Sequence, residues 1–89
     1  MRLTDPVAAF VTNAITDQAD PGEVVDYEVQ FELAPRPGGY NPSLVVILVG
    51  RNSGGAPVMA PPATINSAVT TQGAIDTIVA NALTWIRAQ

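Results

Sequence analysis

The acidic side chains of one short segment are the residues of this chain whose types and spacing could do chemistry. Between residues 24 and 33 the sequence reads V-V-D-Y-E-V-Q-F-E-L, so Asp26, Glu28 and Glu32 alternate with apolar residues. This alternation is typical of a β-strand with one face in the core, and it places the carboxylates on the other face with neighbours roughly 7 Å apart. Carboxylates at that spacing suit the acid pair of a glycosidase or an Asp-x-Glu metal site.

The plainer interpretation of this acidic stripe, defined as Asp26, Glu28 and Glu32, is a solvated strand surface. Like charges separated by about 7 Å in water repel by only ~0.6 kcal/mol, so the stripe needs no ligand to neutralise it. A third interpretation is an acidic surface that faces a partner or a lumen. We favour the solvated surface, because the other residue types that catalysis uses are missing from the chain.

The chain contains no histidine and no cysteine, and its four cationic residues are all arginine. General acid–base and nucleophilic catalysis near neutral pH draw mainly on His, Cys and Lys. A metal-dependent nuclease of the Asp…Glu-x-Lys type would lack its lysine. The sequence therefore predicts a protein that is not an enzyme and that has no catalytic residues, no metal site and no cofactor.

A glycine-rich segment, Gly50-Arg51-Asn52-Ser53-Gly54-Gly55, follows an apolar run in the way that phosphate-binding loops follow a strand. Such loops open a helix whose N-terminus faces the phosphate. Here Ala56-Pro57-Val58 follows, with no helical pattern and no lysine. We predict a hairpin loop in which Arg51 is a surface residue.

Two helices are predicted, one near each end of the chain. Asp5 is a suitable N-cap with Pro6 in the first helical position, and apolar residues at helical spacing continue this helix to about Thr16. A second apolar stripe predicts a helix from about Thr71 to Ala88. Trp85 falls at the edge of that stripe, where an indole can pack while its N–H stays near water or a partner.

Between the helices we expect a small antiparallel sheet. The acidic stripe lies on a strand from about Glu23 to Leu33, and Leu44 to Val49 is apolar on both faces, as in a central strand. A short third strand at about Ala56 to Ala60 contains Pro57, which favours an edge position. Residues 63–70 fit either an extended segment or the beginning of the last helix, and both alternatives stay open.

The predicted fold class is therefore α+β: a sheet of two or three strands flanked by an N-terminal and a C-terminal helix, in the order α-β-β-(β)-α. With 89 residues, 47% of them hydrophobic and 13% charged, the chain has the length and apolar content of one folded domain. We expect a single α+β domain over residues 1–89.

The connection between the two main strands, residues 34–43, contains three prolines. Because proline cannot donate to a strand ladder, we expect a loop here that is too long for a tight hairpin turn. Long loops in small domains are often mobile or functional, so this loop is a candidate contact arm. Arg36 and Tyr40 are its candidate contact residues, although Tyr40 could equally pack back over the sheet.

The two main strands require different surroundings: the strand at residues 23–33 has one polar face, whereas the strand at residues 44–49 needs apolar cover on both faces. This difference predicts a partner. Two helices cover one face of the central strand, which leaves the face around Val45, Ile47 and Val49, or the face around Leu44, Val46 and Leu48, without cover. We favour another subunit as the cover, since exposed apolar patches commonly mark interfaces. The alternative is that residues 63–69 fold over it. The candidate interface residues are Arg36, Tyr40, Val45, Ile47, Val49 and Trp85.

A net charge of −4 disfavours binding to nucleic acid and anionic lipid. The longest apolar run has six residues, whereas a membrane-spanning helix needs about 20. We therefore expect no sequence-specific nucleic-acid binding and no membrane partner. No secretory signal is recognisable, so we expect an intracellular protein that could be incorporated into a virion.

In general character the chain is similar to small structural proteins of tailed-phage particles: one compact α+β unit, no catalytic residue types and a long connection between strands. The likeness is one of type and rests on no motif. Our first hypothesis is a non-enzymatic structural protein that forms a homo-oligomeric ring or shell and contacts other structural proteins, as in head–tail joining, tail or capsid decoration. An acidic stripe turned toward a lumen would repel DNA and ease its passage.

The second hypothesis is a small cellular protein-binding or regulatory module, monomeric or dimeric. It would recruit a protein through the same connection or through an open sheet edge.

Overall fold

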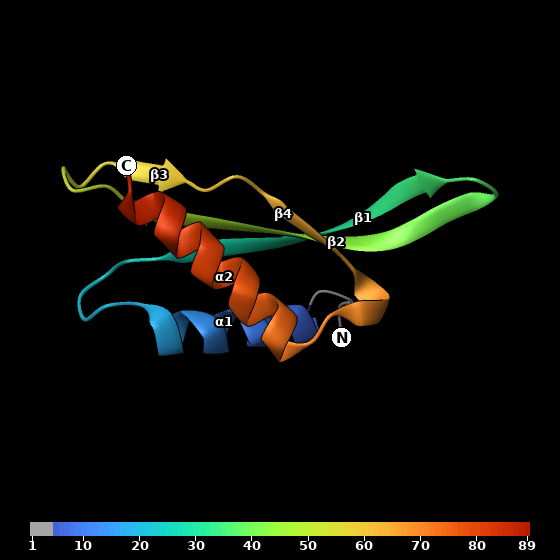
Figure 1. Cartoon of the computed structure of the whole chain (residues 1–89), viewed down its shortest axis with the longest axis horizontal. Helices are drawn as coiled ribbons and strands as arrows, with labels where there is room; N and C mark the ends of the chain where they lie inside the picture. Colours follow the sequence, from blue (N-terminus) through green and yellow to red (C-terminus); the bar gives the residue numbers. More distant parts are fainter. Residues whose placement is uncertain (1–4) are drawn as a thin grey trace.

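The computed structural model describes residues 5–89 and has an α+β fold with two α-helices and one antiparallel sheet (Figure 1). The predicted fold class is confirmed, and the sheet has four strands rather than two or three. In chain order the elements are α1 (Asp5–Gln18), β1 (Asp26–Arg36), β2 (Gly39–Arg51), β3 (Pro57–Met59), β4 (Ala63–Asn66), the short 3₁₀ helix η1 (Ser67–Val69) and α2 (Gln72–Arg87).

Strand β2 is the centre of the sheet. It pairs over Gly39–Val49 with β1, which forms one edge. On its other side it pairs with two short strands in turn, with β4 over Ser43–Val46 and with β3 over Val49–Arg51. All pairings are antiparallel, and the edge position predicted from Pro57 is confirmed for β3.

The connection between β1 and β2 differs from the predicted loop: it is a tight turn, and both strands continue through the proline-containing segment. Arg36 pairs with Gly39, so only Pro37 and Gly38 lie between the strands. Gly38 has a φ of 82°, and a proline followed by a glycine with positive φ is the signature of a type II turn. The contact arm is therefore a projecting β-hairpin and not a loop.

Hydrogen-bond alternation explains how the other two prolines fit into the ladder. In a two-residue hairpin the closing pair is hydrogen-bonded, and the pairs then alternate in type. Pro35, opposite Tyr40, and Pro42, opposite Leu33, are both in pairs that exchange no hydrogen bonds. Their missing N–H groups would point away from the partner strand, so the ladder loses nothing.

Of the two alternatives for residues 63–70, the extended segment is confirmed for Ala63–Asn66, and the beginning of the last helix is wrong, because α2 begins only at Gln72. Ala63–Asn66 is extended as β4, and Ser67–Val69 forms the single turn η1. Asn66 ends the strand and caps the turn, since its side chain accepts a hydrogen bond from the Ala68 N–H at 2.8 Å. α2 then begins after Thr71, whose hydroxyl accepts from the Ala74 N–H at 3.2 Å.

Both helices lie on one face of the sheet, and the hydrophobic core lies between the helices and this face. The β2 side chains that point toward the helices, Leu44, Val46 and Leu48, are only 1–2% exposed. They pack against buried residues from both helices: Val7, Val11, Ala14, Ile75, Val79, Leu83 and Ile86.

The helices do not reach the distal half of the β1–β2 hairpin (Figure 1). A strand of 13 residues spans about 43 Å, whereas a helix of 16 residues spans about 24 Å. The molecule is accordingly elongated, with principal extents of 47 × 21 × 20 Å. The prediction that β1 turns one face into the core is wrong for this half, because Phe31 and Leu33 are 42% and 54% exposed.

Candidate functional site

The surface of the sheet opposite the helices, which we call the open face, carries most of the predicted site residues. The β1–β2 register sets their neighbours: Asp26 lies opposite Val49, Glu28 opposite Ile47, Gln30 opposite Val45 and Glu32 opposite Ser43. Side chains of directly opposed residues share one face of a sheet. The acidic stripe and the apolar row of β2 are therefore neighbours on the same surface.

The apolar row of Val45, Ile47 and Val49 is covered by no element within residues 5–89. Val45 is 9% exposed, since β1 and β4 flank it, and Ile47 and Val49 are half-buried. Met59 of β3 lies opposite Val49 and extends the apolar surface with 59% of its area exposed. The alternative in which residues 63–69 fold over this face is wrong, because Ala63–Asn66 pairs beside β2 as strand β4.

The acidic stripe is exposed along β1. Its one described side-chain hydrogen bond is to Glu28, whose Oε1 accepts from Gln30 Nε2 at 3.1 Å. Among residues 5–89 no group of three or more acidic, histidine or cysteine side chains is placed to hold a metal ion. The stripe is exposed in the single chain and borders the apolar row.

The structure does not bring the six candidate interface residues together. Val45, Ile47 and Val49 lie on the open face, whereas Arg36 and Tyr40 lie at the tip of the hairpin. Tyr40 does not pack back over the sheet, since 62% of its area is exposed. Trp85 lies on α2, on the helix side of the sheet, and is 38% exposed.

Two grooves lie on the helix side of the sheet, and no acidic or basic side chain lines either of them. One, with a volume of about 260 Å³, lies beside Trp85 and is lined by Val46, Pro61, Ala63, Ile78, Asn81, Ala82 and Trp85. The other, of about 440 Å³, lies at the base of the hairpin and is lined by Pro6, Val7, Phe10, Phe31, Pro42, Leu44, Ser67 and Thr70. Both can hold an apolar group, and neither presents a titratable group for catalysis.

The glycine-rich segment forms the β2–β3 turn, as predicted, and the backbone N–H groups of Asn52, Gly54 and Gly55 are hydrogen-bonded within the turn. Asn52 Oδ1 accepts hydrogen bonds from the N–H groups of Gly54 and Ala56 at 2.9 and 3.0 Å. Arg51 is exposed and donates to the Gly55 carbonyl at 2.9 Å. No helix follows this turn, so its geometry does not suit phosphate binding.

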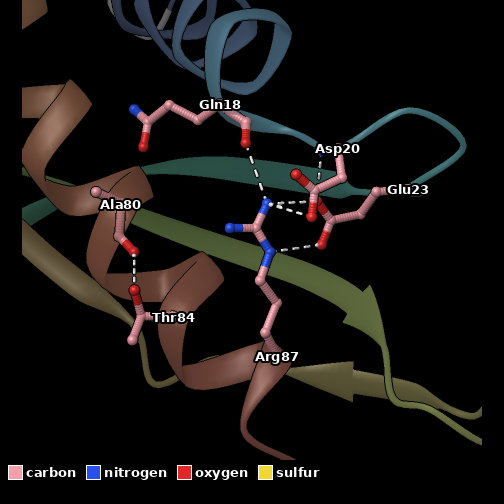
Figure 2. Close-up of polar contacts among 6 residues, drawn as sticks. All are labelled: Gln18, Asp20, Glu23, Ala80, Thr84 and Arg87. Atoms are coloured by element: carbon pink, nitrogen blue, oxygen red, sulfur yellow. Dashed lines mark hydrogen bonds and ion pairs between the residues drawn. The ribbon is translucent and has the colours of Figure 1, made fainter.

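A charged cluster that the sequence analysis missed fastens the end of α2 to the α1–β1 connection (Figure 2). Arg87 donates to both carboxylate oxygens of Glu23, at 2.6 and 3.1 Å, and to the Gln18 carbonyl at 3.0 Å. Asp20 adds a longer ion pair of 3.6 Å. Because Glu23 and Arg87 are far apart in sequence, no local pattern could have paired them.

The electrostatics of this cluster favour both charged forms. The hydrogen bond from Arg87 lowers the pKa of Glu23 below its usual value, although partial burial opposes the shift. The hydrogen bond to Glu23 likewise raises the pKa of Arg87. The cluster is therefore a structural contact that joins the C-terminal end of α2 to the α1–β1 connection.

No protein-family model matches the chain, and neither a curated protein nor a solved structure matches it. Within the part of the chain that the structure describes, neither helix has the length and hydropathy to cross a membrane.

Proposed function

We propose that this protein is a non-enzymatic structural protein that assembles with other copies of itself through the open face of its sheet. The observation that carries the proposal is the one-sided arrangement of the fold. Both helices pack on the same side of the sheet, and the apolar row of Val45, Ile47 and Val49 on the other side has no cover within residues 5–89.

A second copy is the occupant that this face suits, because the open face carries complementary charges around its apolar row. Acidic residues line its β1 side, while Arg36 and Arg51 lie near its opposite ends. Two such faces can bury their apolar rows against each other and set arginines of one copy near acids of the other. A closed assembly would also give a small, disulfide-free domain added stability.

The absence of catalytic residue types supports a structural role. The chain has no histidine, cysteine or lysine, and the two grooves within residues 5–89 are lined by apolar and uncharged residues. In its most specific form, the proposal is a small component of a tailed-bacteriophage particle, in head–tail joining, the tail or capsid decoration. The likeness in general type to such proteins supports this form.

The test is the mass of the assembly formed by Ile47→Asp, measured by native mass spectrometry beside the unchanged protein. A carboxylate in the centre of the apolar row would prevent burial of the face, so we expect the variant to lose the contacts through this face and to form a smaller assembly of folded chains than the unchanged protein. Thr77→Asp adds the same charge on the exposed surface of α2 and should leave the assembly intact. Circular dichroism verifies that Ile47→Asp remains folded. A variant that assembles like the unchanged protein would contradict the proposal.

A stable monomer at high concentration would favour the alternative, a small cellular module that binds a different protein. In that case the open face would serve the other protein. Imaging of the purified chain by negative-stain electron microscopy separates rings and shells from single small particles.

A further inference from the structure

The outer edge of β1 is an uncovered strand edge with its own hydrogen-bonding groups. β1 has 11 residues, it is the last strand on its side of the sheet, and each of its residues is exposed or half-buried. No described element therefore lies over this edge. Natural sheets usually cover, shorten or interrupt an edge of this length, because its free N–H and C=O groups can pair with another chain.

The direction of these groups follows from the ladder. The Leu48 carbonyl accepts from the Ala60 N–H at 2.9 Å, so Leu48 bonds away from β1. Its opposite residue, Tyr27, is then in a pair without hydrogen bonds, and its N–H and C=O point outward. Because the pairs alternate in type, the N–H and C=O groups of Val29, Phe31 and Leu33 also point outward. At Pro35, which has no N–H, only the carbonyl is available.

We propose that two copies of this chain pair through their β1 edges, antiparallel about a two-fold axis at Phe31, to form one continuous sheet. This inference rests on the proposed function, since it names a second surface through which the copies assemble. Each copy would place Val29 opposite Leu33 of the other, and the two Phe31 residues opposite each other. The exposed apolar side chains of β1 would then meet across the edge.

The charges of β1 favour this register. With Phe31 on the axis, Asp26 of one copy lies opposite Arg36 of the other, and Glu28 and Glu32 lie opposite Ala34 and Gln30. Arg36 makes no ion pair among the described residues, so its charge is free for this contact. Opposed charges on neighbouring strands stabilise a sheet, whereas like charges directly opposite destabilise it.

The neighbouring registers are worse in both overlap and charge. Residues whose N–H and C=O groups point outward must lie opposite residues of the same kind on the other copy. One strand can therefore shift along the other only in steps of two residues. A step in one direction sets Glu28 opposite Glu32, and a step in the other sets Glu32 opposite Glu32. The register centred on Phe31 alone overlaps all of β1 and sets no two acids directly opposite.

Cysteine cross-linking tests both the pairing and the register, because the chain has no cysteine of its own. In the proposed register, position 30 of one copy faces position 32 of the other in a pair without hydrogen bonds. The Cα atoms of such a pair lie about 4.5 Å apart, which a disulfide can bridge. An equimolar mixture of Gln30→Cys and Glu32→Cys should therefore oxidise to the mixed dimer far more than either variant alone.

Thr77→Cys, on the exposed surface of α2, measures cross-linking from random collision. A mixed dimer at this background level would overturn the inference. Efficient linkage of Gln30→Cys with itself, or of Glu32→Cys with itself, would overturn the register.

A proline substitution separates the hydrogen bonds of the edge from its side chains. Leu33→Pro removes an outward N–H that the β1–β2 ladder does not use, as Pro35 already does two residues further on. Leu33→Ala removes the same side chain and keeps the N–H. We expect Leu33→Pro to raise the dissociation constant of the pair about tenfold or more beyond Leu33→Ala.

Equal dissociation constants for the two variants would contradict pairing through the edge. If the unchanged protein assembles while cross-linking and proline variants show no edge contact, this inference fails and the proposed function stands. If the unchanged protein is a monomer, both fail.

Discussion

At Gly50 the side chain of Ile86 from α2 lies directly against the backbone of β2. A Cβ atom at this position would lie 2.7 Å from Cγ2 of Ile86, and Ile86 is fully buried. The sequence suggested that Gly50 ends the strand, but β2 continues through it to Arg51. The glycine is required by close packing rather than by a turn.

Gly50→Ala should therefore destabilise the fold by about 1–3 kcal/mol, since the added methyl group displaces Ile86 from a packed core. Urea unfolding measures this change. Gly73→Ala is the matched control, because a Cβ there meets nothing within 4 Å and alanine favours the helix. The double variant Gly50→Ala with Ile86→Ala should lose less than the sum of the single losses. Additive losses would show that the contact is not the cause.

Glu23 gives the fold a pH dependence. Its pKa is lower in the folded chain than in the unfolded chain, because Arg87 bonds its charged form. The resulting stability is fully present above the unfolded pKa of about 4.3 and is lost as pH falls through the lower folded value. The raised pKa of Arg87 plays no part in this window, because arginine stays charged throughout it.

Glu23→Gln should cost about 1 kcal/mol or less at pH 7, since Arg87 is 40% exposed and solvent screens the pair. The difference from the unchanged protein should shrink toward zero as the pH falls through the folded pKa. Unfolding by urea at several pH values between 7 and 3 measures it. Glu32→Gln, on the exposed acidic stripe, is the control and should change the stability little. A pH-independent cost at Glu23 would refute the assignment.

At the scale of elements, the hairpin separates what the sequence could predict from what it could not. Helical apolar patterns predicted α1 and α2, an alternating pattern predicted β1, and a run that is apolar on both faces predicted β2. The prolines at 35 and 42 were misleading, because their cost depends on whether each lies in a hydrogen-bonded pair. The type of each pair depends on the position of the turn, which Pro37 and Gly38 set.

The turn itself gives a prediction for the hairpin. Gly38 adopts a φ of 82°, which a β-branched residue rarely adopts. Gly38→Val should cost about 1–2 kcal/mol, localised to the distal half of β1 and β2. Hydrogen exchange of the backbone amides between residues 33 and 42 should speed up, while the core amides of Val46 and Leu48 change little. Unchanged exchange in the hairpin would argue against this turn.

The candidate site was predictable in part. The sequence predicted that one face of this strand lacks cover, either that of Val45, Ile47 and Val49 or the opposite one. The structure leaves the face of Val45, Ile47 and Val49 open within residues 5–89. It could not predict that the acidic stripe borders the same face, since this depends on the β1–β2 register. It also could not predict that Trp85 lies on the helix side of the sheet, because the pattern of α2 does not tell which face of the sheet it covers.

At the scale of the whole molecule, the fold is an elongated domain with one covered and one open sheet surface. The helices bury the core side of β2, and the hairpin extends beyond them with exposed apolar residues on one side (Figure 1). A two-stranded ribbon without a cover is only marginally stable in water. Assembly with further copies would give the open face, the edge and the hairpin the contacts that the single chain does not supply.

The mass of the unchanged protein in solution tests this central claim most directly. Native mass spectrometry over a concentration series from low to high micromolar should give a discrete multiple of the 9.3-kDa chain mass at the upper end. The multiple should fall toward the single-chain mass on dilution, because association depends on concentration. A mass of 9.3 kDa at every concentration would contradict self-assembly through the open face and through the β1 edge alike.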